Sequence, residues 1–174
     1  MKYLLDFDRT VFDMEGLYLA IEQNNPGVDL GTTASLEGID LEQFLFADAV
    51  QFFSTHAKTD IEIVSSGFGL TGQWEVEYQT KKIALSGVAK YVNNVHVVPD
   101  SKISTIKRIA RESDEITYVD DHPENVANAV QHISGLVVVY LDRSGQSTEI
   151  AGARTISTLS ELDVKIQELW YECY

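Results

Sequence analysis

The chain has 174 residues, of which 44% are hydrophobic and 23% are charged, a composition typical of one folded domain and unlike that of a disordered chain. Its 27 acidic and 13 basic side chains give a net charge of -14, which argues against nucleic-acid binding through a basic face and against an anionic membrane surface. The single cysteine, Cys173, allows no intrachain disulfide, and the apolar run at 136–141 is too short to span a bilayer. We therefore expect a cytoplasmic protein.

Short apolar runs alternate with helical patterns along the chain, which predicts βαβ units and a parallel sheet. The runs are rich in Val, Ile, Leu and Tyr and lack polar alternation, as expected of strands that are covered on both faces. The predicted strands are residues 3–5, 61–64, 95–98, 116–119 and 136–141, with a shorter candidate at 155–156.

Apolar side chains at helical spacing fill the segments between these strands. The predicted helical stripes are Met14, Leu17, Tyr18 and Ile21; Leu45, Ala49, Phe52 and Phe53; Ile103, Ile106, Ile109 and Ala110; and Val126, Ala129, Val130 and Ile133. The segment between the first two strands is longer than a crossover needs. We interpret residues 14–45 as a small, mostly helical insertion over one end of the sheet.

Polar side chains follow each of the first four predicted strands. They are Asp6, Asp8 and Thr10; Ser65 and Ser66; Asp100 and Lys102; and Asp120 and Asp121. Because ligands of an open parallel sheet bind beyond the carboxyl ends of its strands, we expect these side chains to share one site. Lys102 lies in the first turn of its predicted helix, and we choose it over Lys107, which projects away from that edge.

The four carboxylates of this set, Asp6, Asp8, Asp120 and Asp121, would repel one another strongly. At about 4 Å each like pair costs roughly 4 kcal/mol at an effective dielectric of 20. Such a cluster takes up protons or binds a cation, and Mg²⁺ is the hard ion that prefers a few carboxylates, water and substrate phosphate. The alternative is that these acids are helix caps and turn formers, as Asp often is.

The order and strand context of these residues resemble a known superfamily. Asp6-Phe7-Asp8-Arg9-Thr10, then Ser65, Lys102 and Asp120-Asp121 are similar to the motifs of the haloacid dehalogenase superfamily, over residues 1 to about 142. The resemblance implies a three-layer α/β fold around a doubly wound parallel sheet with strand order 5-4-1-2-3. It also implies one domain over residues 1–174, with a core of 1–13 and 46–174 and a small helical cap at about 14–45.

The resemblance also implies roles for individual residues. Asp6 would be the nucleophile that accepts a phosphoryl group, and Asp8 the general acid and base, with its main-chain carbonyl on the metal. Ser65 would donate a hydrogen bond to the phosphoryl oxygens, and Lys102 would neutralise charge. Asp121 would bind Mg²⁺, with Asp120 bound directly or through water, and Arg9, Thr10 and Ser66 would contact the substrate.

The acid at position 8 favours phosphate chemistry, because a halide leaving group needs no proton. The sequence thus predicts a Mg²⁺-dependent phosphomonoester hydrolase with a small phosphorylated substrate, acting as a monomer or homodimer without nucleic acid or membrane. Two departures from the superfamily pattern, Arg9 in place of a common glycine and Asn125 in place of a common acid, motivate an alternative. This alternative is a regulatory or binding module of the same fold with little or no turnover.

Three other signals compete with this interpretation. Residues 67–72 match the G-x-G-x-x-G dinucleotide fingerprint, but they follow the second strand, and no acid ends the next strand at about 20 residues, so we interpret them as a turn. Receiver domains place their paired acids after the first strand, whereas here the pair ends the fourth. We interpret His122, beside the pair, as a solvated turn residue.

Overall fold

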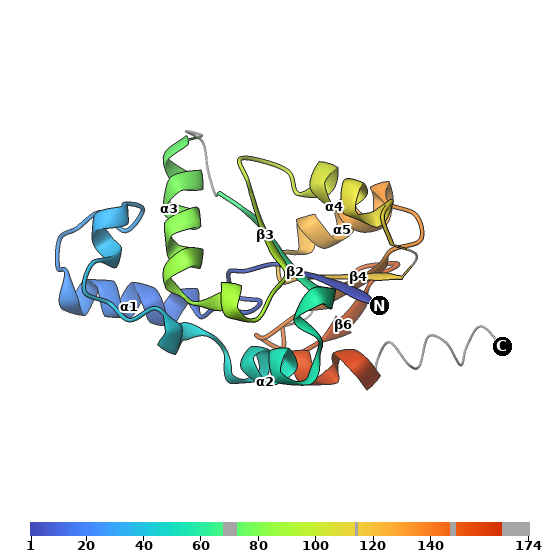
Figure 1. Ribbon diagram of the computed structural model, residues 1–174, viewed down its shortest axis with the longest axis horizontal. Helices are drawn as coiled ribbons and strands as arrows, with labels where there is room; N and C mark the ends of the chain where they lie inside the picture. Colours follow the sequence, from blue (N-terminus) through green and yellow to red (C-terminus); the bar gives the residue numbers. More distant parts are fainter. Residues whose placement is uncertain (68–72, 114, 147–148, 165–174) are drawn as a thin grey trace.

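A single parallel sheet organises the chain in the computed structural model, which describes residues 1–67, 73–113, 115–146 and 149–164 (Figure 1). Six strands follow the spatial order β3-β2-β1-β4-β5-β6. Their bounds are β1 Lys2–Leu5, β2 Ile61–Ser66, β3 Asn94–Val98, β4 Ile116–Asp120, β5 Val137–Leu141 and β6 Arg154–Ile156. The predicted order of five strands is present but incomplete, because β6 pairs in parallel beyond β5 and extends the sheet.

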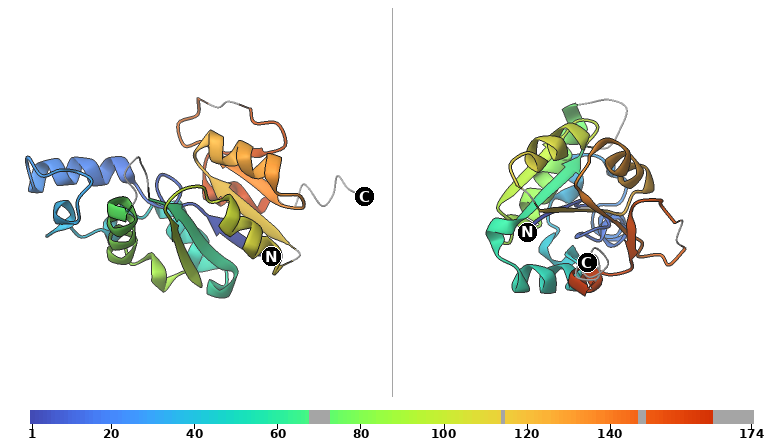
Figure 2. Two further views of the ribbon diagram at one scale, coloured as in Figure 1. Left: turned by 90° about the horizontal axis from the view of Figure 1, so that it is seen from above. Right: turned by 90° about the vertical axis from the view of Figure 1, so that its right-hand side faces the viewer.

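Helices cover both faces of this sheet and form the outer layers of a three-layer α/β fold (Figure 2). The α-helices are α1 Met14–Asn24, α2 Ala47–Thr55, α3 Gln73–Leu85, α4 Ile103–Ala110 and α5 Pro123–His132. Short 3-10 turns are η1 Thr33–Leu36, η2 Glu42–Phe44, η3 Lys58–Asp60, η4 Val88–Lys90 and η5 Leu159–Glu161. The predicted stripes lie on α1, α2, α4 and α5, whereas none was predicted for α3.

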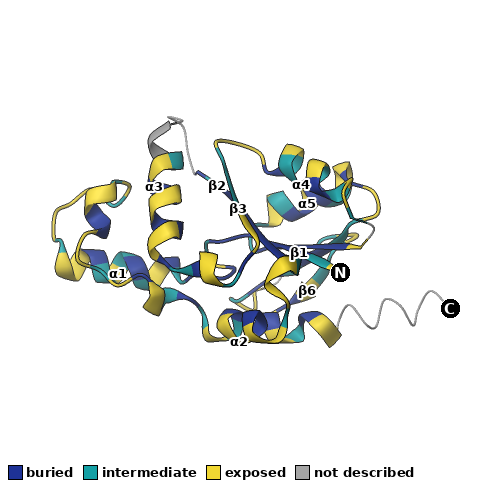
Figure 3. Ribbon diagram, in the orientation of Figure 1, coloured by how far each residue is buried: buried dark blue, intermediate teal, exposed yellow. Residues whose placement is uncertain are grey.

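Alternating side chains of the strands pack into two separate cores, as the strand period of two requires. Tyr3 and Leu5 of β1 join the core that contains the buried faces of α1 and α2. Leu4 points to the opposite side and joins the core under α4 and α5. The central strands are buried in Figure 3, because helices or loops cover them on both faces.

The segment between β1 and α2 contains α1, η1 and η2, and it lies beyond the carboxyl ends of the strands (Figure 1). Asp13 caps α1, since its side chain accepts a hydrogen bond from the Gly16 backbone N–H at 2.9 Å. α1 extends away from the sheet beside α3, which also packs against η1. These elements stand over the sheet edge where the polar strand-end residues emerge.

Some sequence features lie outside the described residues. Positions 68–72 of the glycine-rich motif and Cys173 belong to this group. In the part of the chain that the structure describes, no helix combines the length and hydrophobicity needed to cross a membrane.

Candidate active site

The parallel register brings the ends of β1 and β4 together. Leu5 pairs with Val119, so the next residues, Asp6 and Asp120, emerge side by side, and the Asp6 backbone N–H donates to the Val119 carbonyl at 2.9 Å. Lys102 reaches both carboxylates from the start of α4. Its Nζ lies 2.5 Å from Asp6 Oδ1 and 2.8 Å from Asp120 Oδ2.

Asp120 is fully buried and receives hydrogen bonds from four different groups. They are Lys102 Nζ, the Tyr118 hydroxyl, the His122 backbone N–H at 2.7 Å, and Asn125 Nδ2 at 3.1 Å from Oδ2. Asn125 therefore supports Asp120. With both Asp120 oxygens engaged by donors, this carboxylate orients Lys102 and fits the role of a supporting group.

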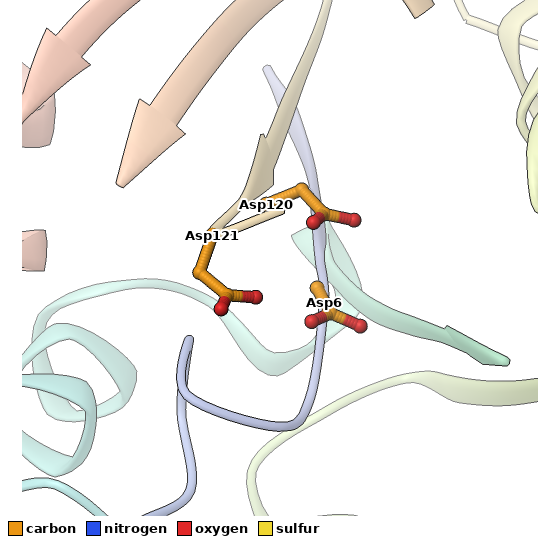
Figure 4. A group of neighbouring side chains, drawn as sticks. All are labelled: Asp6, Asp120 and Asp121. Atoms are coloured by element: carbon orange, nitrogen blue, oxygen red, sulfur yellow. The ribbon is translucent and has the colours of Figure 1, made fainter. Parts of the chain in front are cut away.

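Asp6, Asp120 and Asp121 each offer one carboxylate oxygen, and these atoms lie within 4.8 Å of one another (Figure 4). Burial, opposed by Lys102 and reinforced by the two neighbouring acids, raises the pKa of Asp6 well above its usual range. Burial and the Asp120 charge raise the pKa of Asp121 to about 6. For Lys102, burial is outweighed by Asp6 and Asp120, which raise its pKa. Three acids around one base leave surplus negative charge, and their hard oxygen ligands fit a divalent cation such as Mg²⁺.

A cleft of about 270 Å³ opens over these carboxylates. Its walls are Asp6, Asp8, Arg9, Ser65, Ser66, Lys102, Asp121, His122, Glu124 and Asn125. Of the eight predicted site residues besides Asp120, all but Thr10 lie on this wall. Asp100, which was expected at the same sheet edge, is exposed and lies off the wall. Thr10 is fully buried behind it, where its backbone carbonyl accepts a hydrogen bond from Arg143 at 2.7 Å.

Solved structures with the same arrangement of layers were found by comparison of the whole chain. A haloacid dehalogenase-like family hydrolase from Xanthomonas campestris superposes with a TM-score of 0.61 at 14% identity, over 97% of this chain and 96% of that one. An L-2-haloacid dehalogenase gives a TM-score of 0.64 at 14% identity, over 95% and 98%. D,D-heptose 1,7-bisphosphate phosphatase from Burkholderia thailandensis gives 0.53 at 12% identity, over 96% and 99%.

The chain has the haloacid dehalogenase fold. No family model and no curated protein sequence matches it. Because dehalogenases and phosphatases share this fold, the fold by itself does not choose the reaction, and the choice has to come from the residues of the site.

The Asp8 side chain lies apart from the cluster of Asp6, Asp120 and Asp121, although the sequence predicted one cluster of four carboxylates. Its side chain points to α3, where Lys82 Nζ donates to Oδ1 at 2.6 Å and Gln79 Nε2 donates to Oδ2 at 2.7 Å. Asp6 and Asp8 therefore flank the cleft with different partners. The predicted contact of the Asp8 main-chain carbonyl with a metal stays a prediction.

Sequence reasoning missed Lys82 and Gln79, because α3 carries no clear apolar stripe. Gln79 bridges two site residues, since the same Nε2 donates to Ser65 Oγ at 2.8 Å. Lys82 is buried among the rings of Phe7 and Tyr78, and burial lowers its pKa despite the nearby Asp8. Their spacing of three residues on one helix face, directly after the Ser65 strand, is the signal that could have found them.

Arg9 occupies the position where the haloacid dehalogenase motif commonly has glycine. Its φ is +59°, and among the described residues it is the only non-glycine with positive φ. The turn therefore keeps the left-handed conformation that glycine adopts freely, at a cost of about 1–2 kcal/mol. The Arg9 side chain lines the cleft and pairs with Glu15 at 2.5 Å.

His122 also lines the cleft, which corrects its interpretation as a solvated turn residue. Its Nδ1 is buried and has no hydrogen-bond partner within the described part of the chain. Pro123 begins α5 directly after it, so the start of the helix holds the imidazole against the cleft.

Proposed function

We propose that this chain is a Mg²⁺-dependent phosphomonoester hydrolase that forms an aspartyl-phosphate on Asp6. The observation that carries the proposal is the placement of Asp6. Its carboxylate lies 2.5 Å from Lys102 Nζ and within 4.8 Å of Asp120 and Asp121, at the floor of a cleft that Asp8 also lines. The nucleophile, a fixed cation and a second acid thus face the same small space.

In the first step an Asp6 oxygen attacks phosphorus, and the bond to the leaving oxygen breaks. Asp8 gives a proton to that oxygen, and the phosphoryl group stays bonded to Asp6. In the second step Asp8 takes a proton from water as the water attacks phosphorus and the Asp6–phosphorus bond breaks, which releases phosphate, frees the Asp6 carboxylate and returns Asp8 to its protonated form. Ser65 lies on the wall of the cleft and would donate a hydrogen bond to the phosphoryl oxygens.

Asp6 and Asp121 would hold Mg²⁺, together with the Asp8 main-chain carbonyl and with Asp120 directly or through water. The bound ion would neutralise charge on the phosphate that an anionic nucleophile must approach. Lys102 supplies a permanent positive charge at the same place, and Arg9 and Ser66 would contact the substrate from the wall of the cleft. The expected substrate is a small phosphorylated molecule in the cytoplasm, and the enzyme would act as a monomer or homodimer.

The two sequence departures that favoured a non-catalytic module have structural explanations that are compatible with turnover. Arg9 adopts the backbone conformation of the glycine it replaces, and Asn125 supports Asp120. Dehalogenation is the other candidate reaction for this fold. Asp8 favours the phosphatase, because a halide ion leaves without a proton.

The test is hydrolysis of p-nitrophenyl phosphate with Mg²⁺ or with EDTA, by the natural protein and by Asp6→Asn. We expect turnover that requires Mg²⁺ and is lost in the variant, and acid-quenched protein should carry a phosphoryl group on the peptide that contains Asp6. Asp100→Asn is the matched control, because Asp100 also follows a strand but is exposed and does not line the cleft.

Metal-independent turnover or full activity of Asp6→Asn would refute the proposal. Chloride release from L-2-chloropropionate would replace it with the dehalogenase reaction. Mg²⁺ binding by calorimetry without hydrolysis of any member of a broad phosphate-ester panel would favour the non-catalytic module.

A further inference from the structure

A second cavity of about 430 Å³ adjoins the catalytic cleft on the α1 and α3 side. The two spaces share Asp8 and Arg9 in their walls, so they meet at Asp8, the proposed general acid. Its volume lies in the range of about 300–1,000 Å³ that holds small organic ligands. Side chains of both α1 and α3 line this cavity. The two helices lie crosswise to each other (Figure 1).

The walls of the cavity away from Asp8 carry mainly aromatic and apolar side chains. Met14 and Tyr18 come from α1, and Tyr78 comes from α3. Burial, with smaller contributions from nearby charges, raises the pKa of both tyrosines, so both phenols are neutral at physiological pH. Aromatic rings bind other rings in offset or edge-on contacts that add to the effect of apolar burial.

The positive charges at this cavity already have partners. Lys82 is 1% exposed and pairs with Asp8, and Arg9 pairs with Glu15 at the junction of the two spaces. Among the described residues that line this cavity, no other side chain is cationic. Beyond Arg9 at the junction, a second phosphate or a carboxylate on the substrate would therefore meet no unpaired cation and would pay a desolvation cost.

We propose that this cavity binds the organic part of the substrate, and that this part is an uncharged alcohol carrying an aromatic ring. The inference rests on the proposed phosphatase function for the adjoining cleft. With the phosphoryl group at Asp6, the leaving oxygen points past Asp8, and the ring lies between α1 and α3 against Tyr18 and Tyr78.

The experiment compares three phosphate esters of primary alcohols, whose leaving groups are similar in basicity. They are benzyl phosphate, ethyl phosphate and 1,3-propanediol bisphosphate. Binding is measured by calorimetry to Asp6→Asn with Mg²⁺, and kcat/KM is measured with the natural protein. We expect benzyl phosphate to exceed the other two by about tenfold in both measurements, which corresponds to about 1.4 kcal/mol.

Tyr18→Ala is the diagnostic variant, because Tyr18 is only partly buried and packs at the margin of the core below α1. The preference for benzyl over ethyl phosphate should fall about fivefold in this variant and persist in Tyr18→Phe. Leu19→Ala is the control on the same helix, since Leu19 is 59% exposed and lies off the cavity wall. It should retain the natural preference.

The outcomes separate the two proposals. Tenfold tighter binding of benzyl phosphate without hydrolysis of any ester would refute the phosphatase and support the aromatic site. Hydrolysis with ethyl phosphate or the bisphosphate as good as benzyl phosphate would support the phosphatase and overturn the aromatic site. An unchanged preference in Tyr18→Ala would also overturn it.

Discussion

The Lys82 ammonium lies 2.6 Å from Asp8 Oδ1, although the two residues are 74 positions apart in the chain. Lys82 is 1% exposed and reaches Asp8 from α3, while Asp8 follows β1. Because its amine has so little access to water, its charge is compensated mainly by this contact. The packing of α3 therefore determines where the second acid of the candidate active site points.

Replacement of Lys82 by methionine should separate this positioning role from substrate binding. Lys82→Met removes the 2.6 Å contact and leaves Asp8 with Gln79. We expect kcat for p-nitrophenyl phosphate to fall about 10–100-fold with little change in KM, because small displacements of a catalytic group cost that much. Lys81→Met is the control, since Lys81 is exposed on the same helix. Equal kcat values for both variants would contradict the positioning role.

Arg9 offers a direct measurement of backbone strain. Both Arg9→Gly and Arg9→Ala remove the exposed ion pair with Glu15, which is worth at most about 1 kcal/mol, but only glycine relieves the φ of +59°. We expect the glycine variant to have a free energy of unfolding about 1 kcal/mol higher than the alanine variant. Urea denaturation measures the difference. If alanine is as stable as glycine, the turn is unstrained.

Asp121 should link stability to pH and to Mg²⁺. Its folded pKa of about 6 lies above the usual value near 4, so the folded state holds this proton more tightly than the unfolded chain. Its stabilising contribution is complete below about pH 4 and is lost as the pH rises through 6. Without metal, Asp121→Asn should therefore equal the natural protein near pH 4 and exceed it by about 1–3 kcal/mol at pH 7.5.

Mg²⁺ should reverse that ranking. At pH 7.5 the ion should raise the Tm of the natural protein and leave that of Asp121→Asn nearly unchanged, because only the natural protein keeps both of the proposed carboxylate ligands, Asp6 and Asp121. Thermal unfolding with and without Mg²⁺ at the two pH values is the measurement. Hydrogen bonds and ion pairs outweigh burial and lower the pKa values of Asp48 and Glu62. The stability that these two residues contribute is lost only as the pH falls into the acidic range, so it does not change around pH 6, where Asp121 titrates. The same Mg²⁺ response in both proteins would exclude Asp121 as a ligand.

Tyr118 tests the support of Asp120. Its hydroxyl donates to Asp120 Oδ2, and the side chain is fully buried on β4. Tyr118→Phe keeps the ring and removes one donor to a buried charge, so the free energy of unfolding should fall by about 1.5–3 kcal/mol. Tyr91→Phe, which keeps the ring stacked on Phe53, is the control in denaturant titrations. A loss below 0.5 kcal/mol, on the order of surface substitutions, would show that the other donors suffice.

The sequence alone determined that Asp6, Ser65, Lys102 and the Asp120-Asp121 pair share one place. These residues each follow a short apolar run, and in a parallel sheet the carboxyl ends of the strands coincide. Local pattern and strand direction are enough for that inference, so no knowledge of distant contacts is needed. Periodicity also predicted the helical stripes of α1, α2, α4 and α5, whereas the order of five strands was implied by the resemblance to the haloacid dehalogenase motifs.

Only the tertiary structure decided which group each polar side chain contacts. Asp8 turns to Lys82, Asn125 supports Asp120, and Thr10 lies behind the cleft. These contacts depend on how α3 and α5 pack and on the left-handed turn at Arg9, and neither appears in the periodicity of the sequence. Side-chain partners follow from long-range packing, whereas the sharing of a sheet edge follows from strand direction alone.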